Sequence, residues 1–426
     1  MSKAIYIVDG ARTPFLKSRN RPGPFSAADL ATIAGRALLL RQPFEPNELD
    51  EVILGCAVPA PDEMNIARVA ALRMGCGRRV PAWAVMRNCA SGMQALDAAI
   101  ANMNAGRSQL VLAGGVDALS RAPLLFSEGM VMWLSNFYTA KTIGQKLALL
   151  PRFRPQYLAP VIGIVKGLTD PNVGLIMGQT AENLAYRFGI GRTAQDAFAA
   201  RSHQRVLQAQ ENGWLQEIVP MYDERGNVYT RDDGVRADST VENLAKLQPF
   251  FDKHYGTVTA GNSSQITDGA VWMILATEEA LDQYGLTPIG RIVDTHWAAL
   301  DPAHMGLGPV HAATPLLEAN GLGLEDIDAW EINEAFAAQV LACIEAWKDE
   351  RYCREELGLE GALGELDMDK LNIDGGAIAL GHPVGASGAR IVLHLLHVLR
   401  RTGGRRGMAA ICIGGGQGGA MLIEAL

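Results

Sequence analysis

The chain has 426 residues, of which 48% are hydrophobic and 20% charged, and its formal net charge is −8. This composition is typical of a globular protein with two or three domains. The negative charge argues against nucleic acid as a partner, and no apolar run is long enough to span a bilayer. These bounds leave enzymes and binding proteins that work in water.

The beginning of the chain and the cysteines predict a cytoplasmic protein. Residues 1–9 lead directly into a strand pattern, with no signal peptide and no Arg- and Ser-rich transit segment. The cysteines show no CxxC pair and no zinc-finger spacing, which indicates reduced thiols. They lie at positions 56, 76, 89, 343, 353 and 412. The histidines show no metal-ligand spacing either, so we expect no metal site.

Short, apolar and β-branched segments along the chain predict strands that are covered on both faces. They fall at 51–55, 109–115, 270–276, 289–296, 327–332, 408–413 and 420–424. Two helices stand out between them. One is expected over 93–104, and the other opens at 386–388 and ends in the basic pair Arg400-Arg401, which suits a helix C-terminus.

The two ends of the chain repeat one pattern. In each, a glycine-containing turn opens a helix, and a further glycine leads into an apolar strand that closes on another glycine turn. This order predicts an internal duplication of an α/β unit. Chance similarity between two βαβ units would give the same pattern, so the duplication needs independent support.

The most informative residue is Cys89, which comes directly before the helix predicted over 93–104. A thiol at a helix N-terminus faces unpaired N–H groups and the positive end of the macrodipole. Both favour the thiolate, which is the nucleophilic form. The sequence therefore predicts a cysteine that attacks carbonyl carbons, although a single Cys beside Ala and Gly is more often a small buried hydrophobe.

A second group of residues near the other end strengthens this interpretation. His382 lies between Gly381 and Pro383, and Cys412 is followed by three glycines. Two cysteines, a histidine and glycine-rich turns are the components of cysteine acyl-transfer chemistry. A single His is often only structural, but here it lies in a turn with no apolar stripe to join.

The middle of the chain, about 121–251, differs in composition. Between Gly129 and Leu168 there is no Asp or Glu, whereas lysines, arginines and large apolar side chains are frequent. This insertion could bind a polyanionic ligand, an anionic membrane surface or a partner subunit. The alternative is a packed helical subdomain whose basic side chains are simply solvated.

At this point the motifs resemble those of the thiolases, in order through almost the whole chain. The nucleophile motif is Asn88-Cys89-Ala90-Ser91-Gly92, and Asn333-Glu334-Ala335-Phe336 resembles the Asn-Glu-Ala-Phe motif. Gly381-His382-Pro383 and Cys412-Ile413-Gly414 resemble the histidine and second-cysteine motifs. The segment 256–269 resembles the one that closes the coenzyme A (CoA) site.

The resemblance implies the α/β thiolase fold, with two duplicated βαβ halves in a layered αβαβα core and an inserted loop domain. We expect an N-terminal half over 1–120 and 252–285, the loop domain over 121–251 and a C-terminal half over 286–426. A homodimer or tetramer is also implied.

The resemblance further implies CoA-dependent cleavage of 3-ketoacyl-CoA, or the reverse Claisen condensation. Cys89 would take the acyl group, His382 would accept protons and Cys412 would protonate the enolate. Asn333, through a water, and His382 would serve the enolate oxygen, and the N–H groups of Cys89 and Gly414 the tetrahedral intermediate.

For CoA, which is a substrate, the resemblance carries over Arg236 near the adenine, Ala260 and Ser264 along the pantetheine, and Met177 and Phe336 in the pocket. No metal, cofactor or prosthetic group is implied. Arg236 could instead be a surface arginine, and Met177 and Phe336 could be plain core residues.

Within the family, the basic insertion resembles the β-subunits of fatty-acid oxidation complexes. This predicts broad or long-chain thiolysis in β-oxidation, beside a hydratase/dehydrogenase partner. Those subunits often carry His where this chain has Asn333, and short-chain thiolases commonly carry His where it has Ile176. A short-chain acetyl-CoA C-acetyltransferase is therefore the alternative. A decarboxylating ketosynthase would lack Cys412, an idle scaffold would have no reason to keep the four site residues, and a zinc module would need ligand spacing.

Overall fold

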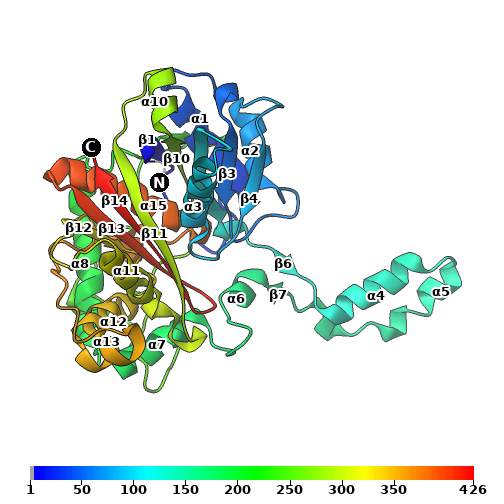
Figure 1. Ribbon diagram of the computed structural model, residues 1–426. Helices are drawn as coiled ribbons and strands as arrows, with labels where there is room; N and C mark the ends of the chain where they lie inside the picture. Colours follow the sequence, from blue (N-terminus) through cyan, green and yellow to red (C-terminus); the bar gives the residue numbers. More distant parts are fainter. Residues whose placement is uncertain (1–3) are drawn as a thin grey trace. The chain divides into compact units, whose positions relative to one another are not determined.

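The structure is a computed structural model that describes residues 4–426 (Figure 1). The chain divides into two units. The large unit comprises the chain up to Arg121 and from Asp170 onward, and the small unit is Ala122–Thr169.

The first half of the large unit builds one half of a twisted sheet from apolar strands. In sheet order they are β4 (Ala82–Val85), β3 (Glu51–Gly55), β5 (Leu110–Ala118), β10 (Thr267–Ala276) and β1 (Ile5–Arg12). Strand β3 is parallel to both β4 and β5, whereas β10 runs antiparallel to β5 and β1. The parallel strands read as continuous apolar runs because both of their faces are covered.

The second half repeats this arrangement. Its strands are β12 (Ala329–Ile332), β13 (Arg406–Ile413), β14 (Gln417–Ala425) and β11 (Gly290–Ala299). Strand β12 is parallel to β13, and β14 is antiparallel to β13 and β11. Pairing of β1 with β11 joins the halves, and with β2 (Leu16–Lys17) they form a 10-stranded sheet within residues 4–426. This repeat supports the predicted duplication.

Two helices lie between the halves of the sheet, namely α3 (Ser91–Asn104) and α15 (Val384–Thr402). They pack against each other, and α15 contacts strands of both halves, including β5 and β13 (Figure 1). Helix α15 is buried almost all round, as expected for a helix between two sheets.

Outer helices cover the other faces of the sheet. Helix α1 (Ala27–Leu39) packs on β10, and α2 (Ile66–Met74) packs on β3 and β4. Helix α11 (Gly308–Ala319) packs on β14 and β11. The result is the layered αβαβα core that the resemblance implied.

The remaining helices of the large unit surround this core. They are α7 (Met177–Arg187), α8 (Arg192–Glu211), α9 (Val241–Leu244), α10 (Glu278–Tyr284), α12 (Ala337–Lys348), α13 (Glu350–Leu357) and α14 (Ala377–Leu380). Strands β8 (Met221–Tyr222) and β9 (Val228–Tyr229) form a separate hairpin. Short 3-10 turns lie at Pro46–Glu48, Leu119–Arg121 and Pro302–Leu307.

The small unit consists of short elements around aromatic contacts. Its strands β6 (Leu124–Leu125) and β7 (Val161–Ile162) pair with each other, and its helices are α4 (Glu128–Thr139), α5 (Ile143–Leu147) and α6 (Gly163–Gly167). Two 3-10 turns, Leu150–Arg152 and Pro155–Leu158, complete it. The Trp133 ring stacks on Phe137 at 5.3 Å. Many large apolar side chains of this unit are nevertheless exposed.

Comparison with the sequence predictions shows where they succeed. Every predicted strand is present, and the first begins at Ile5, although residues 1–3 lie outside the described part. Helix α3 starts two residues before the predicted 93, and α15 begins at Val384 rather than at 386. The four-residue strand β4, all of whose side chains are only half-buried, was not predicted.

The small unit is narrower than the segment 121–251, since residues 170–251 belong to the large unit. The predicted three-part domain boundaries stay a prediction. No helix within residues 4–426 is both long and apolar enough to cross a bilayer.

Candidate active site

Cys89 lies between the end of β4 and the start of α3, in a turn that crosses to the second half. Its neighbour Asn88 adopts a positive φ of 44°. The Asn88 Nδ2 group donates a hydrogen bond of 2.8 Å to the carbonyl oxygen of Gly414, beyond the end of β13. The nucleophile turn of the first half is thereby tied to the glycine turn of the second half.

The surroundings of Cys89 shift the pKa of its thiol in both directions. Burial raises the pKa of the Cys89 thiol, and the Asp117 carboxylate raises it further. The backbone N–H groups of Gly414 and of Cys89 itself bond to the sulfur and lower the pKa, but by less. The backbone donors therefore act in the direction expected from the sequence, but desolvation outweighs them. Cys89 needs a base.

Cys412 is the next-to-last residue of β13 and is 1% exposed. Burial raises the pKa of this thiol well above its usual value, and the nearby Cys89 and Cys343 add to the effect. The charge of a Cys89 thiolate would thus act on the Cys412 thiol. At neutral pH Cys412 is a protonated thiol, which suits a proton donor.

His382 lies in the turn between α14 and α15 and is buried. Its Nδ1 atom lies 2.6 Å from the Ser387 Oγ atom, which fixes the ring, and its backbone N–H donates to the Gln265 carbonyl at 3.0 Å. Burial, with a smaller contribution from Arg390, lowers the pKa of His382 to about 4. The ring is thus neutral near pH 7. Its Nε2 atom has no partner within residues 4–426 and is free to accept a proton.

Asn333 follows β12 and is completely buried. Its backbone N–H donates to the Ala410 carbonyl on β13 at 3.0 Å, two residues before Cys412. Neither Nδ2 nor Oδ1 of its side chain has a partner in the described part of the chain. Buried amides without partners are rare in proteins. This amide is therefore available to a substrate or to a water.

These side chains belong to strand ends and turns of both halves, which the packing of α3 against α15 holds together. Cys89 follows β4, whereas Asn333 follows β12 and Cys412 lies next to the end of β13. His382 joins them through α15, which crosses α3 closely. A Cβ atom on Gly388 would lie 3.4 Å from the Ala90 Cα atom. The four predicted catalytic side chains thus come from both halves.

The residues predicted to bind CoA lie at varied distances from this centre. Met177 begins α7, and its sulfur would lie 3.3 Å from a Cβ atom on Gly414. Phe336 is buried, and the backbone of Ser264 donates to Ala335 beside it at 2.9 Å. Ala260 and Arg236 are exposed. The structure does not test their role as CoA contacts.

Several side chains that hold the site were not singled out from the sequence. Glu334 is a buried carboxylate that accepts from Ser202 Oγ at 2.6 Å and from the Ile378 N–H at 3.1 Å, so it links Asn333 to α14. Gln265 Nε2 donates to the carbonyls of Gly234, Ile378 and Ala379. Their presence within or next to the motifs was the only signal in the sequence.

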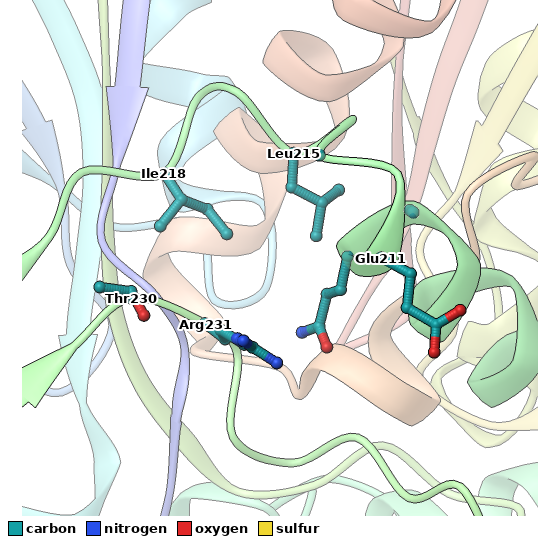
Figure 2. Close-up of a pocket in the computed structure, with 8 residues that line it drawn as sticks. Glu211, Leu215, Ile218, Thr230 and Arg231 are labelled. Carbon is teal, nitrogen blue, oxygen red and sulfur yellow. The ribbon is translucent and has the colours of Figure 1, made fainter.

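No group of three or more His, Cys, Asp or Glu side chains that could hold a metal ion occurs among residues 4–426. A pocket of about 390 Å³ opens elsewhere (Figure 2), and it contains none of the predicted site residues. It is lined by Ala209, Gln210, Glu211, Gly213, Leu215, Ile218, Thr230 and Arg231. Glu211 and Arg231 are the charged residues of this lining, and they indicate no particular ligand or reaction.

Comparison with known protein families covers both halves. The family model for the thiolase N-terminal domain matches residues 5–279, and the model for the thiolase C-terminal domain matches residues 286–425. Together they span almost the whole chain.

Individual relatives agree with this match. The chain is 38% identical over 423 residues to a 3-ketoacyl-CoA thiolase of Yersinia enterocolitica, covering 99% of this chain and 96% of the relative. The crystal structure of the Bacillus anthracis acetyl-CoA acetyltransferase matches with a TM-score of 0.84 at 37% identity, over 100% of this chain and 99% of that one. Human mitochondrial 3-ketoacyl-CoA thiolase in complex with CoA matches with a TM-score of 0.84 at 35% identity, over 100% and 98%.

Proposed function

Because this chain belongs to the thiolase family and is an acyltransferase of that family, we propose that it cleaves 3-ketoacyl-CoA with CoA, or runs the reverse condensation, by a ping-pong mechanism through an acyl-Cys89 intermediate. The observation that carries this proposal is a set of four groups in segments that the packing of α3 on α15 and the hydrogen bond from Asn88 to Gly414 hold together. They are two protonated thiols, Cys89 and Cys412, a neutral His382 with a free Nε2, and the unpaired amide of Asn333.

In the first half-reaction, Cys89 Sγ attacks the 3-keto carbon while His382 Nε2 accepts its proton. The N–H groups that point at the Cys89 sulfur, its own and that of Gly414, then lie beside the developing oxyanion. The bond between C2 and C3 breaks, leaving an acyl group on Cys89 and the enolate of acetyl-CoA. Cys412 gives its proton to the C2 carbon, while Asn333, through a water, and His382 stabilise the enolate oxygen.

In the second half-reaction, the Cys412 thiolate recovers a proton from the His382 imidazolium. Neutral His382 then accepts the thiol proton of incoming CoA, whose sulfur attacks the acyl-Cys89 carbonyl. Collapse of this intermediate releases the shortened acyl-CoA, and His382 returns the proton to Cys89. Thiol and imidazole groups balance every proton, so we propose that CoA is a substrate and that no cofactor is needed.

The thioester substrates must reach Cys89 along a channel. We propose that Arg236 binds near the adenine, that Ala260 and Ser264 line the pantetheine path and that Met177 and Phe336 line the pocket. The contact of Met177 with Gly414 and that of Ser264 with Ala335 support this path, because both lie next to catalytic segments.

The first experiment is a thiolysis assay of the purified protein with 3-ketoacyl-CoAs of short, medium and long chain. Activity that rises with chain length would support a role in fatty-acid β-oxidation, as the name of the Yersinia relative suggests. Activity confined to acetoacetyl-CoA would favour the alternative, a short-chain acetyltransferase, as the name of the Bacillus anthracis protein suggests. Activity with none would refute the proposal.

The intermediate is tested separately by intact-protein mass spectrometry after incubation with acetyl-CoA. We expect one acetyl group on the native protein and none on Cys89→Ala. Cys76→Ala is the matched control, because Cys76 is a buried thiol in a different part of the core. Full labelling of Cys89→Ala would refute Cys89 as the nucleophile.

We further propose a cytoplasmic homo-oligomer that pairs through β4. This strand ends the sheet, so its outer edge offers unpaired backbone groups to a second copy. Met86, which follows it, is 58% exposed. Analytical ultracentrifugation should show a dimer or larger species for the native chain and a monomer for Met86→Glu. A native monomer would exclude this assembly.

For the small unit we propose peripheral contact with an anionic membrane. Its one acidic residue, Glu128, is outnumbered by Lys141, Lys146, Arg152, Arg154 and Lys166. Exposed apolar side chains lie among them, including Tyr138 and Ile143, each 78% exposed. Pelleting with anionic vesicles should occur at low salt, weaken at high salt and fall in Lys141→Glu/Lys146→Glu. If the protein did not pellet with the vesicles at low salt, the membrane proposal would be refuted. A hydratase/dehydrogenase subunit would then be the remaining candidate partner of the small unit.

A further inference from the structure

A buried carboxylate that the proposed mechanism does not use lies beside the nucleophile. Asp117 is the next-to-last residue of β5 and is completely buried. Its charge acts directly on the Cys89 thiol, whose pKa it raises. Because this effect opposes thiolate formation, Asp117 cannot serve to activate Cys89 electrostatically.

The hydrogen bonds of Asp117 indicate a different role. Its Oδ1 atom accepts from the Cys56 thiol at 3.3 Å and from the Val58 N–H at 2.9 Å. Its Oδ2 atom accepts from the Ala57 N–H at 3.4 Å and from the Gly385 N–H at 2.5 Å. Three of these donors follow β3 in the first half, whereas the fourth belongs to the second half. The carboxylate therefore connects the halves.

The bond to Gly385 meets a specific need of α15. Gly385 is the second residue of this helix, and the N-cap Pro383 supplies no side-chain cap. An uncapped helix start leaves N–H groups without partners, and a carboxylate there also interacts favourably with the helix dipole. Asp117 thus caps α15 from another strand. The same first turn carries Ser387, which bonds His382.

Close backbone packing makes this connection stiff. A Cβ atom on Gly385 would lie 2.5 Å from the Val116 carbonyl oxygen and 2.9 Å from the Asp117 Oδ2 atom. A Cβ atom on Gly115 would lie 2.0 Å from the Gly385 carbonyl oxygen. The first turn of α15 therefore rests directly on the end of β5, with no side chain between them to absorb a shift.

We propose that Asp117 is a positioning residue that anchors the first turn of α15 to the first half and thereby fixes His382 relative to Cys89. This role rests on the proposed function, in which His382 is the base for Cys89. Misplacement of such a group by about 1 Å can cost about 100-fold in rate. Loss of the carboxylate should therefore slow the reaction of Cys89 through His382, whereas the loss of its charge alone would favour the Cys89 thiolate and speed the reaction.

A double-mutant cycle tests this coupling. The readout is the rate of iodoacetamide alkylation of Cys89, located by peptide mass spectrometry, in Asp117→Ala, His382→Ala and the double variant. We expect Asp117→Ala to slow alkylation by about 10-fold or more in the native background. It should cause no further slowing once His382 is absent. Equal slowing in both backgrounds would show a general structural effect and overturn the proposal.

Further variants keep the test decisive. Asp117→Asn puts an N–H₂ group in place of one acceptor oxygen and so loses the bond to Val58 or to Gly385, whichever way the amide lies. It serves if Asp117→Ala does not fold, and an unchanged alkylation rate in it would also overturn the proposal. The matched control is Asp328→Asn, because Asp328 accepts from the N–H groups of Arg405 and Arg406 at the other end of β13. This control should stay within about 2-fold of the native rate.

The alkylation cycle uses no acyl-CoA, so its outcome is separate from that of the proposed function. A native protein without thiolysis activity would refute the proposed function, whereas the cycle would still report whether Asp117 acts through His382. If His382→Ala left the alkylation rate unchanged, His382 would not be the base for Cys89. The proposed role of Asp117 would then be overturned as well.

Discussion

The turn that leads into α15 and the middle of α15 each hold a buried histidine, and the two are in opposite protonation states. Before the first turn, burial lowers the pKa of His382 to about 4. In the middle, burial acts in the same direction on His394, but Glu217 and Asp374 outweigh it and raise the pKa to about 10. One ring is neutral at pH 7 and the other is a cation.

The difference lies in the partners that each ring meets. His394 has Glu217 3.1 Å from Nδ1 and Asp374 3.2 Å from Nε2, and these acids also bind Arg12 and Arg401. His382 has only a hydroxyl on Nδ1, and its Nε2 is unpaired among residues 4–426. Buried polar groups are normally satisfied. For these two rings, the comparison therefore teaches that ionic pairing on both nitrogens ties His394 to the fold, whereas the missing partner on Nε2 leaves His382 available to a substrate.

The largest expected effect follows from removing the unpaired ring. His382→Ala should lower kcat for thiolysis by about 10²–10⁴-fold, the usual contribution of a general base. The variant should remain folded, because the ring makes one side-chain hydrogen bond in the structure. Steady-state assays beside circular dichroism check this, and activity near the native level would contradict the assignment of the base.

Asn333→Ala sharpens the comparison with a second unpaired group. Loss of a donor to the enolate oxygen should lower kcat by about 10²–10³-fold. Stability should be unchanged or slightly higher, because the amide that is removed is buried without partners. Urea unfolding and the thiolysis assay, measured on the same variant, check this prediction. A variant that lost stability but kept its activity would contradict it.

His394→Gln should show the reverse pattern. It leaves Glu217 and Asp374 buried with one cation fewer, and breaking such pairs costs about 3–5 kcal/mol. We expect the lower end, about 3 kcal/mol in urea unfolding, because Arg12 and Arg401 remain as partners. Activity per folded molecule should change by less than about 10-fold. If His394→Gln kept its stability but lost its activity, the contrast between a structural His394 and a catalytic His382 would be refuted.

The smallest effect is a difference in pH dependence. The pKa of His382 is depressed on folding, so the unfolded chain binds its proton first and stability is lost as pH falls from about 6.5 towards 4. The pKa of His394 is raised, so its contribution is complete below about 6.5 and is lost as pH rises towards 10. The cost of His394→Gln should therefore be larger at pH 6 than at pH 10. Equal costs would contradict a charged His394.

Much of the fold follows from local patterns in the sequence. Apolar runs predict the parallel and antiparallel strands, since burial on both faces leaves no room for polar residues. Cys89, His382, Asn333 and Cys412 were also predicted from motifs, because the proposed chemistry requires particular residue types, and their catalytic roles stay a prediction. Strand β4, which lies at the end of the sheet and is only half-buried, was not predicted.

Features that depend on the assembled interior could not be read from the sequence. The helix-start argument for Cys89 omitted desolvation, which only the folded structure reveals and which reverses the pKa shift. The pairing of Asp117 with Gly385 joins residues 268 positions apart, so no local pattern signals it. The ionic surroundings that separate His394 from His382 are likewise tertiary.

The division of the site between two halves has a consequence during protein synthesis. Cys89 is translated about 300 residues before His382, which at about 5–20 residues per second takes about 15–60 s. In the proposed mechanism, the nascent chain carries the nucleophile throughout that interval without its base, without the Gly414 donor and without the bond from Asp117 to α15. Acyl transfer by this mechanism therefore has to wait until the second half is made and folded.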